Sequence, residues 1–266
     1  MRLGYSAVTA GIVDVRQSFE VAARYGLDIE LSSDMAEMFP QLPGPGELAE
    51  MGRAAGVGFT LHLPFVDLNL ASLIEPAWRT SLDRMLQALE YGAAVGAQVG
   101  VLHTGQVPLR HPTLIEMAFE RLERALAEMA RPPIPVAVEN LVLDEQDLLQ
   151  TPAELVRVVE KAGEGFGFTL DLPHAFVQGG AGQIKDYLEA MQASKAPLLH
   201  LHLHDNNGDW DAHLPVGAGK LPYADFREDL AGFTGTAALE VSQGEEGVRT
   251  SLEALKRFWG VGGGQL

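Results

Sequence analysis

The feature that most constrains this chain is a repeated alternation of β-rich runs with amphipathic segments. Such alternation, found eight times over about 250 residues, is typical of an α/β protein built as a closed (β/α)8 TIM barrel. The predicted strands lie at 2–6, 27–32, 57–63, 99–104, 135–140, 166–172, 198–204 and 237–241. The predicted helices lie at 14–25, 45–55, 76–96, 112–130, 152–162, 182–195, 222–231 and 247–259.

No linker, low-complexity tract or block of charge divides the chain, so we expect residues 1–266 to form a single TIM-barrel domain. The segment GVGGGQL at 260–266 is expected to be a frayed end. No apolar run reaches the roughly 18 to 20 residues that a membrane span needs, and the first residues lack a signal-peptide core. These features favour a cytoplasmic protein without membrane contact.

Composition limits the chemistry. The chain has no cysteine, so disulfides and thiolate ligands are excluded, and any metal must be bound by nitrogen and oxygen atoms. A formal net charge of −17 argues against broad contact with nucleic acid, because a duplex binder needs lysine and arginine along the phosphates. Bound divalent cations would weaken that argument, so nucleic acid is a less favoured partner rather than an excluded one.

Side chains that bind metals recur where the predicted strands end. Active sites of (β/α)8 barrels lie at the C-terminal ends of the strands, so these side chains are expected to converge. An inward-facing carboxylate on an apolar strand is costly unless a cation or another partner meets it. The candidates on this argument are His62, His103, Glu139, Asp171, His202 and Glu240.

The stretch HLHLHDNNGDWDAH at 200–213 adds further candidates. Its histidines at 200, 202 and 204 share one face of a strand, because side chains alternate between faces. We expect His200 to be structural and low in the barrel. His204 either contacts a substrate or supports a metal ligand. Asp211 and His213, like His174 after Asp171, gain weight as candidates only from the residues around them.

Three other residues are more ambiguous. Glu30, near the end of the second strand, is a candidate for substrate binding or acid–base chemistry, with a solvated loop carboxylate as an equal alternative. The loop VGAGKLPY at 216–223 could bind a phosphate through its amides and Lys220, although a plain tight turn is favoured. His111 is expected at the surface before a helix.

Six segments carry a family resemblance that runs from about residue 3 to 258. They are HLPFVDLNLAS (62–72), VGVLHTG (99–105), AVENL (137–141), GFTLDLPHAF (167–176), HLHDNNGDWDAHLPVGAG (202–219) and ALEV (238–241). Together they resemble the xylose-isomerase-like TIM-barrel superfamily. That superfamily holds sugar and sugar-phosphate isomerases and epimerases together with the endonuclease IV family of AP endonucleases.

Resemblance to the isomerases implies one divalent cation held at the positions of Glu139, Asp171, His202 and Glu240. The two glutamates would then act as the acid–base pair, moving a proton through a cis-enediolate. His174 would contact a substrate hydroxyl.

Resemblance to the endonucleases implies three zinc ions that share these residues. His62, His103 and Glu139 would form the first site, and Glu139, Asp171, His202 and Glu240 the second. His174, Asp211 and His213 would form the third. The chain departs from the endonuclease pattern at His204, which replaces an asparagine. It also departs in a shortened loop between His202 and Asp211 and in an extra residue within 62–72.

The first hypothesis is therefore a divalent-metal-dependent isomerase or epimerase of a sugar or sugar phosphate, using zinc, manganese, cobalt or magnesium. The second is a zinc-dependent phosphodiesterase of the AP endonuclease type, with up to three zinc ions and abasic DNA as its substrate. A third, a barrel that binds sugar or metal without turnover, is disfavoured by the intact pair of glutamates. The sequence predicts neither the particular sugar nor the oligomeric state.

Overall fold

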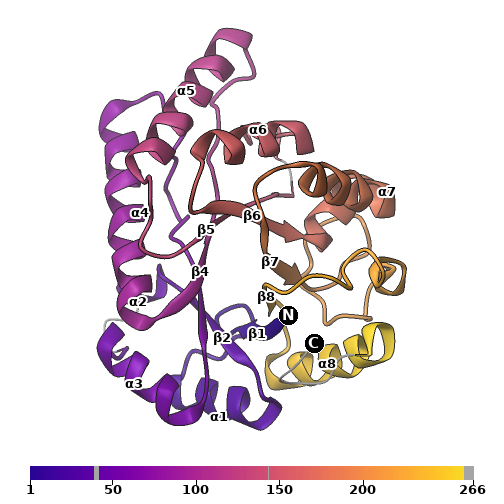
Figure 1. The fold of residues 1–266 in the computed structure, drawn as a ribbon. Coiled ribbons are helices and arrows are strands. Elements are labelled where there is room, and N and C mark those ends of the chain that lie inside the picture. The colour runs from indigo at the N-terminus through magenta and orange to yellow at the C-terminus, as the bar shows by residue number, and fades with distance from the viewer. Residues whose placement is uncertain (39–41, 143, 261–266) are drawn as a thin grey trace.

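The computed structural model, which describes residues 1–38, 42–142 and 144–260, is a closed barrel of eight parallel strands (Figure 1). Each strand pairs with the next in chain order, and β8 pairs with β1 to close the ring. The strands are β1 (Arg2–Ser6), β2 (Asp28–Ser32), β3 (Phe59–His62), β4 (Ala97–Leu102), β5 (Val136–Glu139), β6 (Phe166–Asp171), β7 (Leu198–Leu203) and β8 (Thr236–Leu239). The (β/α)8 barrel predicted from the alternation is confirmed.

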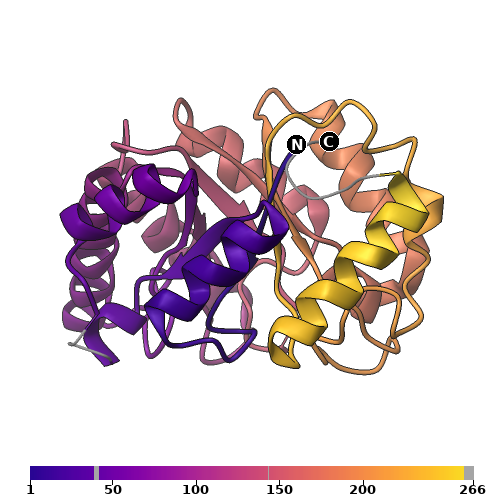
Figure 2. The same ribbon diagram turned by 90° about the horizontal axis from the view of Figure 1, so that it is seen from below.

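Helices surround the ring of strands (Figure 1). They are α1 (Val15–Tyr25), α2 (Met35–Met38), α3 (Pro45–Ala55), α4 (Glu75–Val95), α5 (Pro112–Glu128), α6 (Pro152–Ala162), α7 (Leu172–Ala193) and α8 (Gly244–Trp259). Helices α1 and α8 lie side by side (Figure 2). The Tyr25 hydroxyl at the end of α1 donates a hydrogen bond to Glu245 of α8 at 3.0 Å. The first and last helices therefore close the outer layer where β1 and β8 close the inner one.

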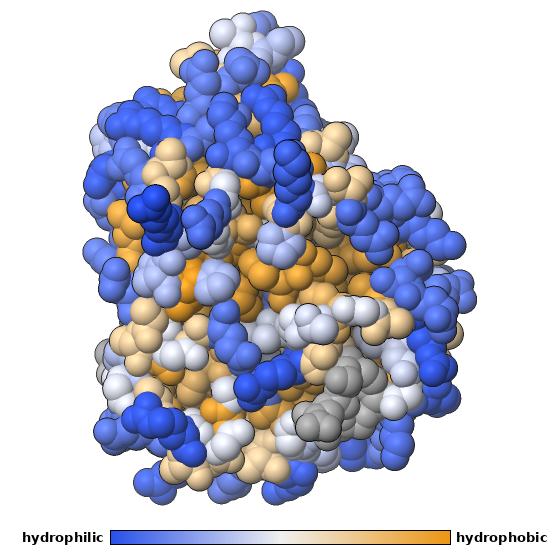
Figure 3. Space-filling view, viewed as in Figure 1, coloured by the Kyte–Doolittle hydropathy of each residue, from blue (hydrophilic) through white to orange (hydrophobic). Residues whose placement is uncertain are grey.

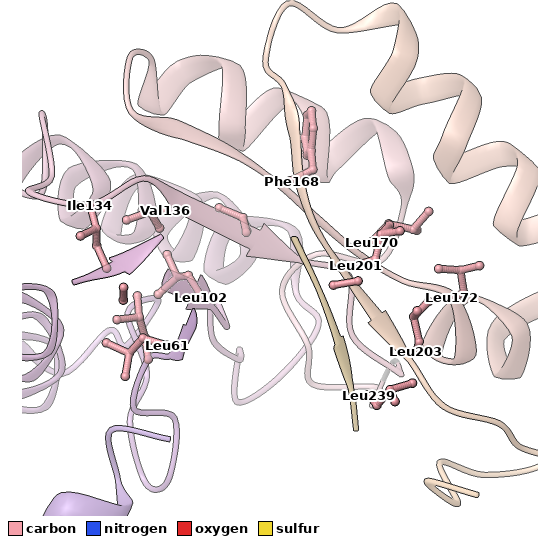
Figure 4. Close-up of a cluster of buried hydrophobic side chains, with 14 of the residues drawn as sticks. Leu61, Leu102, Ile134, Val136, Phe168, Leu170, Leu172, Leu201, Leu203 and Leu239 are labelled. Atoms are coloured by element: carbon pink, nitrogen blue, oxygen red, sulfur yellow. The ribbon is translucent and has the colours of Figure 1, made fainter. Parts of the chain in front are cut away.

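The main core lies between strands and helices. Its leucines come from several strands and are fully buried (Figure 4): Leu61, Leu102, Leu170, Leu201, Leu203 and Leu239. In β7, Leu201 and Leu203 alternate with His200 and His202, and all four side chains are buried. A strand buried on both faces can thus fill the core with one set of side chains and aim the other set into the barrel.

Two helix predictions need correction. The helix expected at 182–195 is only the second part of α7, which begins at Leu172 directly after β6. The Asp171 side chain accepts a hydrogen bond from the His174 amide at 2.6 Å and so caps this helix. The backbone at Gly179 and Gly180 is not helical, and it interrupts the helical spacing of the apolar residues. The helix expected at 222–231 is a short 3-10 turn, η1 (Tyr223–Phe226).

The short helix α2 was not predicted, and the expected frayed end at 261–266 lies outside the described residues. On the face drawn in Figure 3, hydrophilic side chains gather around the periphery and hydrophobic ones show toward the centre. No helix in the described part of the chain is both long and apolar enough to cross a membrane.

Candidate metal centre

A cavity of about 310 Å³ opens at the C-terminal end of the barrel and gathers most of the predicted site residues. Seven of them line it: His62, His103, Glu139, His174, Asp211, His213 and Glu240. Asp171 and His202 lie fully buried beside them. The contributions come from β3, β5, β6, β7, the first turn of α7 and the segments that follow β4, β7 and β8, so convergence depends on the closed barrel.

Glu139 occupies the middle of this arrangement. One carboxylate oxygen, Oε2, lies 3.0 Å from His103 Nε2 and 3.8 Å from His62 Nε2. The other, Oε1, lies 3.0 Å from His202 Nδ1 and 3.4 Å from His174 Nδ1. Glu139 therefore joins a His62–His103 group on one side to a deeper group on the other.

The deeper group contains Glu139, Asp171 and His202, whose potential ligand atoms all lie within 4.8 Å of one another. Glu240 Oε2 lies 3.4 Å from His202 Nδ1 and extends the same group. Asp171 uses Oδ1 to cap α7, while its Oδ2 lies 3.7 Å from His202 Nδ1. The four residues expected to share a cation are thus assembled around one histidine nitrogen.

A third group centres on Asp211. Its Oδ2 lies 3.0 Å from His213 Nε2 and 3.3 Å from His174 Nε2. His204 also belongs here, since its Nε2 lies 3.7 Å from Asp211 Oδ1 and 3.3 Å from Asp171 Oδ2, and its ring stacks on His213 at 4.1 Å. The sequence predicts for His204 only a contact with substrate or a supporting role beside a metal ligand. The alternation of histidines in β7 was the signal that places it on the site's face.

Burial and mutual contact shift the acidity of these groups. Burial raises the pKa of Glu240 to about 8, with Glu30 and Glu139 acting in the same direction against His202. Burial also tends to raise the pKa of Glu139, but His202 and His103 outweigh it and hold that pKa well below the usual range. Burial, reinforced by His103, lowers the pKa of His62 to about 4. The pKa values of the two glutamates are therefore shifted in opposite directions.

The donor set suits a divalent cation. Imidazole nitrogens and buried carboxylates, with no sulfur ligand, match the nitrogen and oxygen coordination of zinc, manganese, cobalt or magnesium. Asp211 Oδ1 is buried without a hydrogen-bond partner among the described residues, as expected for an oxygen atom that binds a metal ion.

The structure does not bring Lys220 into the cavity. Its side chain is exposed, and its amide donates to the Asn206 carbonyl at 2.8 Å. Two further amides of the loop, those of Gly217 and Leu221, donate to the buried Asp205 carboxylate at 2.9 and 3.0 Å. An internal carboxylate thus occupies amides that a phosphate would need, and the tight turn is the correct interpretation.

The remaining histidines and Glu30 are also located. His200 is fully buried low in the barrel, and His111 lies at the surface as the N-cap of α5, both as expected. Glu30 is 1% exposed inside β2, where Thr60 donates to its Oε2 at 3.0 Å. The alternative of a solvated loop carboxylate is therefore wrong for Glu30.

One wall of the cavity is apolar and was not predicted. It is formed by residues of the segments after β1, β2 and β3: Val8, Met35, Met38, Phe65 and Val66. No lysine or arginine occurs among the described residues that line the cavity. Sequence patterns gave no sign of this wall, because its residues lie in loops and a short helix whose positions depend on distant strands.

Comparison with known proteins agrees with this architecture. A family model described as xylose isomerase-like TIM barrel matches residues 15–258. Uncharacterized protein MJ1614 of Methanocaldococcus jannaschii is 30% identical over 185 residues, which cover 68% of this chain and 69% of that protein. A solved D-tagatose 3-epimerase-like protein superposes with a TM-score of 0.83 and 25% identity over 97% of both chains. The IolI protein, solved with a zinc atom, shares the fold at a TM-score of 0.78 and 14% identity, over 98% of this chain and 100% of its own.

Proposed function

Since the chain belongs to the xylose isomerase-like TIM barrel family, we propose that it is a divalent-metal-dependent isomerase or epimerase of a neutral sugar that acts through a cis-enediolate. The observation that carries this proposal is the pair of buried glutamates, Glu139 and Glu240, which both border the cavity and contact the same histidine, His202. The likeness to a D-tagatose 3-epimerase-like protein supports the same class of substrate.

The two glutamates divide the proton transfer between them. A pair of carboxyl groups whose environments push their pKa values apart can supply an acid and a base at the same pH. Glu139, held ionised by His202 and His103, takes the proton from the carbon beside the substrate carbonyl. Glu240 returns a proton to the enediolate, and burial, which raises its pKa to about 8 in the metal-free protein, favours that role over the role of base.

Glu139, Asp171, His202 and Glu240 would hold the divalent ion, which when bound supplies a Lewis acid that polarises the substrate carbonyl. His174 lines the cavity beside Glu139, where it can orient a hydroxyl of the substrate. Burial of the acid–base pair at the base of the cavity keeps bulk water away from the reacting carbons.

A neutral sugar suits the cavity better than a sugar phosphate does. Four acidic side chains line it, and none of the described lining residues is cationic, so a phosphate would meet carboxylates without a lysine or arginine. The acidic lining residues are Asp34, Glu139, Asp211 and Glu240. The apolar wall offers a surface for the C–H face of a sugar.

Deuterium incorporation tests the proposal directly. Metal-loaded protein is incubated in D2O with a panel of free ketoses and their phosphate esters, and the sugars are followed by NMR. We expect deuterium to enter at the carbon beside the carbonyl of a free ketose, because the enediolate returns to product with a solvent-derived proton. No exchange with any sugar, using protein shown to hold its metal, would contradict the proposal.

Zinc-dependent phosphodiester hydrolysis of the AP endonuclease type is the second candidate. It is favoured by the assembly of the His62–His103–Glu139 group and the Asp211–His213 group beside the deeper one. Elemental analysis of protein purified without chelator or metal-binding tag separates the two. About one ion per chain supports the isomerase, whereas two or three, mostly zinc, would make cleavage of an abasic-site duplex the next assay.

A further inference from the structure

Below the cavity lies one more group of contacting residues, which does not line the cavity: Glu30, His200 and His202. The three residues are 1%, 0% and 0% exposed, and their potential ligand atoms all lie within 4.8 Å of one another. Among the described residues, three buried atoms of this group lack a conventional hydrogen bond: Glu30 Oε1, His200 Nε2 and His202 Nε2. The metal centre described above does not account for Glu30 or His200.

His202 joins this lower group to the cavity. Its Nδ1 faces Glu139 Oε1 at 3.0 Å and Glu240 Oε2 at 3.4 Å, whereas its Nε2 lies 3.4 Å from Glu30 Oε1. A neutral imidazole carries one proton, so an Nδ1 lone pair that binds a cation requires the proton on Nε2. Glu30 Oε1, which lies 3.4 Å away and likewise lacks a hydrogen bond, is a carboxylate oxygen within reach of this proton.

Glu30 is itself held by the barrel. Thr60 Oγ1 donates to its Oε2 at 3.0 Å, and His200 Nε2 lies 3.1 Å from the same oxygen. The Nδ1 atom of His200 lies 2.6 Å from Thr236 Oγ1. Both threonines are register partners on the neighbouring strand, Glu30 with Thr60 and His200 with Thr236, so strand pairing fixes the carboxylate.

We propose that Glu30 is a positioning residue whose carboxylate accepts the Nε2 proton of His202 and thereby directs the Nδ1 lone pair toward the metal centre. This role, which rests on the proposed function, replaces the expectation that Glu30 touches substrate. A carboxylate behind a metal-binding histidine fixes its tautomer and orientation and strengthens it as a ligand.

Metal affinity of the variant Glu30→Gln tests the proposal. Chelator-treated protein is titrated with Zn²⁺ against a competing chelator, and with Co²⁺ while its visible absorption is recorded. We expect the Kd to rise by roughly 10 to 100-fold and the Co²⁺ spectrum to change. An unchanged Kd and spectrum would overturn the role of Glu30.

Asp28→Asn is the matched control. Asp28 lies two residues earlier on the same strand and the same face, but it bonds Arg2, the Gly58 amide and Gln98, away from the metal centre. We expect its loss to lower the melting temperature and leave the metal Kd unchanged. An equal loss of affinity in both variants would mean that Glu30 is only structural.

Histidine NMR supplies a readout that does not depend on how Glu30→Gln folds. In metal-loaded wild-type protein labelled with ¹⁵N-histidine, the resonance missing from a His202→Asn spectrum identifies His202, and we expect the proton on its Nε2. A proton on Nδ1 would overturn this inference and leave the proposed function standing. A wild-type chain that takes up no divalent ion would overturn the inference together with the proposed function.

Discussion

At the scale of single residues, Glu240 illustrates how position determines chemistry. It lies one residue beyond β8, is 8% exposed, contacts His202, and is repelled electrostatically by Glu30 and Glu139. In the metal-free protein, a carboxyl group in such surroundings keeps its proton at a pH where a surface glutamate has lost it.

Replacement of Glu240 by glutamine is therefore expected to preserve the fold and remove the proton transfer. Sugar-dependent deuterium incorporation should fall by roughly 10² to 10⁴-fold, the usual contribution of a general acid or base. Glu246→Gln, on exposed α8 surface, should retain the wild-type rate. Wild-type activity in Glu240→Gln, with an unchanged melting temperature, would refute the assignment.

His62 gives the metal-free protein a specific pH dependence. Its pKa falls from about 6.5 in the unfolded chain to about 4 in the fold, because burial and His103 disfavour the imidazolium. Between these pH values only the unfolded chain binds the proton. The contribution of His62 to the free energy of unfolding is therefore complete above pH 6.5 and declines as the pH falls to 4.

Urea denaturation of chelator-treated protein between pH 4 and 7 measures this effect. The difference between wild type and His62→Gln should change by up to about 3 kcal/mol across the range, with wild type losing more stability at low pH. Parallel curves would show that His62 binds its proton equally well in both states.

At the scale of elements, α7 carries His174 over the centre on its first turn and then breaks at two glycines. Gly180 has φ 70° and ψ −157°, a region open almost only to glycine. Gly182, two residues later, has a normal φ and nothing within 4 Å of an added Cβ.

The pair Gly180→Ala and Gly182→Ala separates backbone strain from packing. Gly180→Ala is expected to lower the free energy of unfolding by roughly 1 to 3 kcal/mol, whereas Gly182→Ala should be neutral or raise it by up to about 1 kcal/mol. Chemical denaturation of both variants checks this, and equal effects would argue against backbone strain at Gly180.

Local periodicity explains which elements the sequence could predict. The alternation in β7 correctly placed His200, His202 and His204 on one face, because a strand imposes that alternation whatever surrounds it. The start of α7 was missed because Asp171 ends a strand and caps a helix at once. The turn in place of the helix at 222–231 depends on long-range contacts, such as the Tyr223 hydroxyl with the His204 carbonyl, that no local pattern reports.

At the scale of the whole molecule, closure of the barrel brings carboxylates from distant parts of the chain into one cluster. The sequence predicted which residues would meet, since strand ends of a barrel share one rim. Glu139 lies between two groups, as the resemblance to the endonucleases implies. The contact of His204 with Asp211 was not predicted, because it depends on side-chain packing across the barrel.

Removal of bound metal should destabilise the whole barrel. An ion present at 100 times its Kd stabilises the folded state by about 2.7 kcal/mol, so a chelator is expected to lower the melting temperature by roughly 5 to 10 °C. Differential scanning calorimetry with and without chelator, followed by restoration with Zn²⁺ or Mn²⁺, measures it. An identical melting temperature in all three samples would argue against an ion that contributes to the fold.

The buried Asp205 has a consequence for how such a barrel diverges. Because its carboxylate holds the amides of Asn206, Gly217 and Leu221 from the inside, the course of the loop after β7 depends little on the side chains it shows to solvent. The exposed loop residues Asn207 and Trp210 are thus expected to accept other side chains with the loop still folded. The part of the loop that can vary is thus separate from Asp211 and His213, the two loop residues that line the cavity.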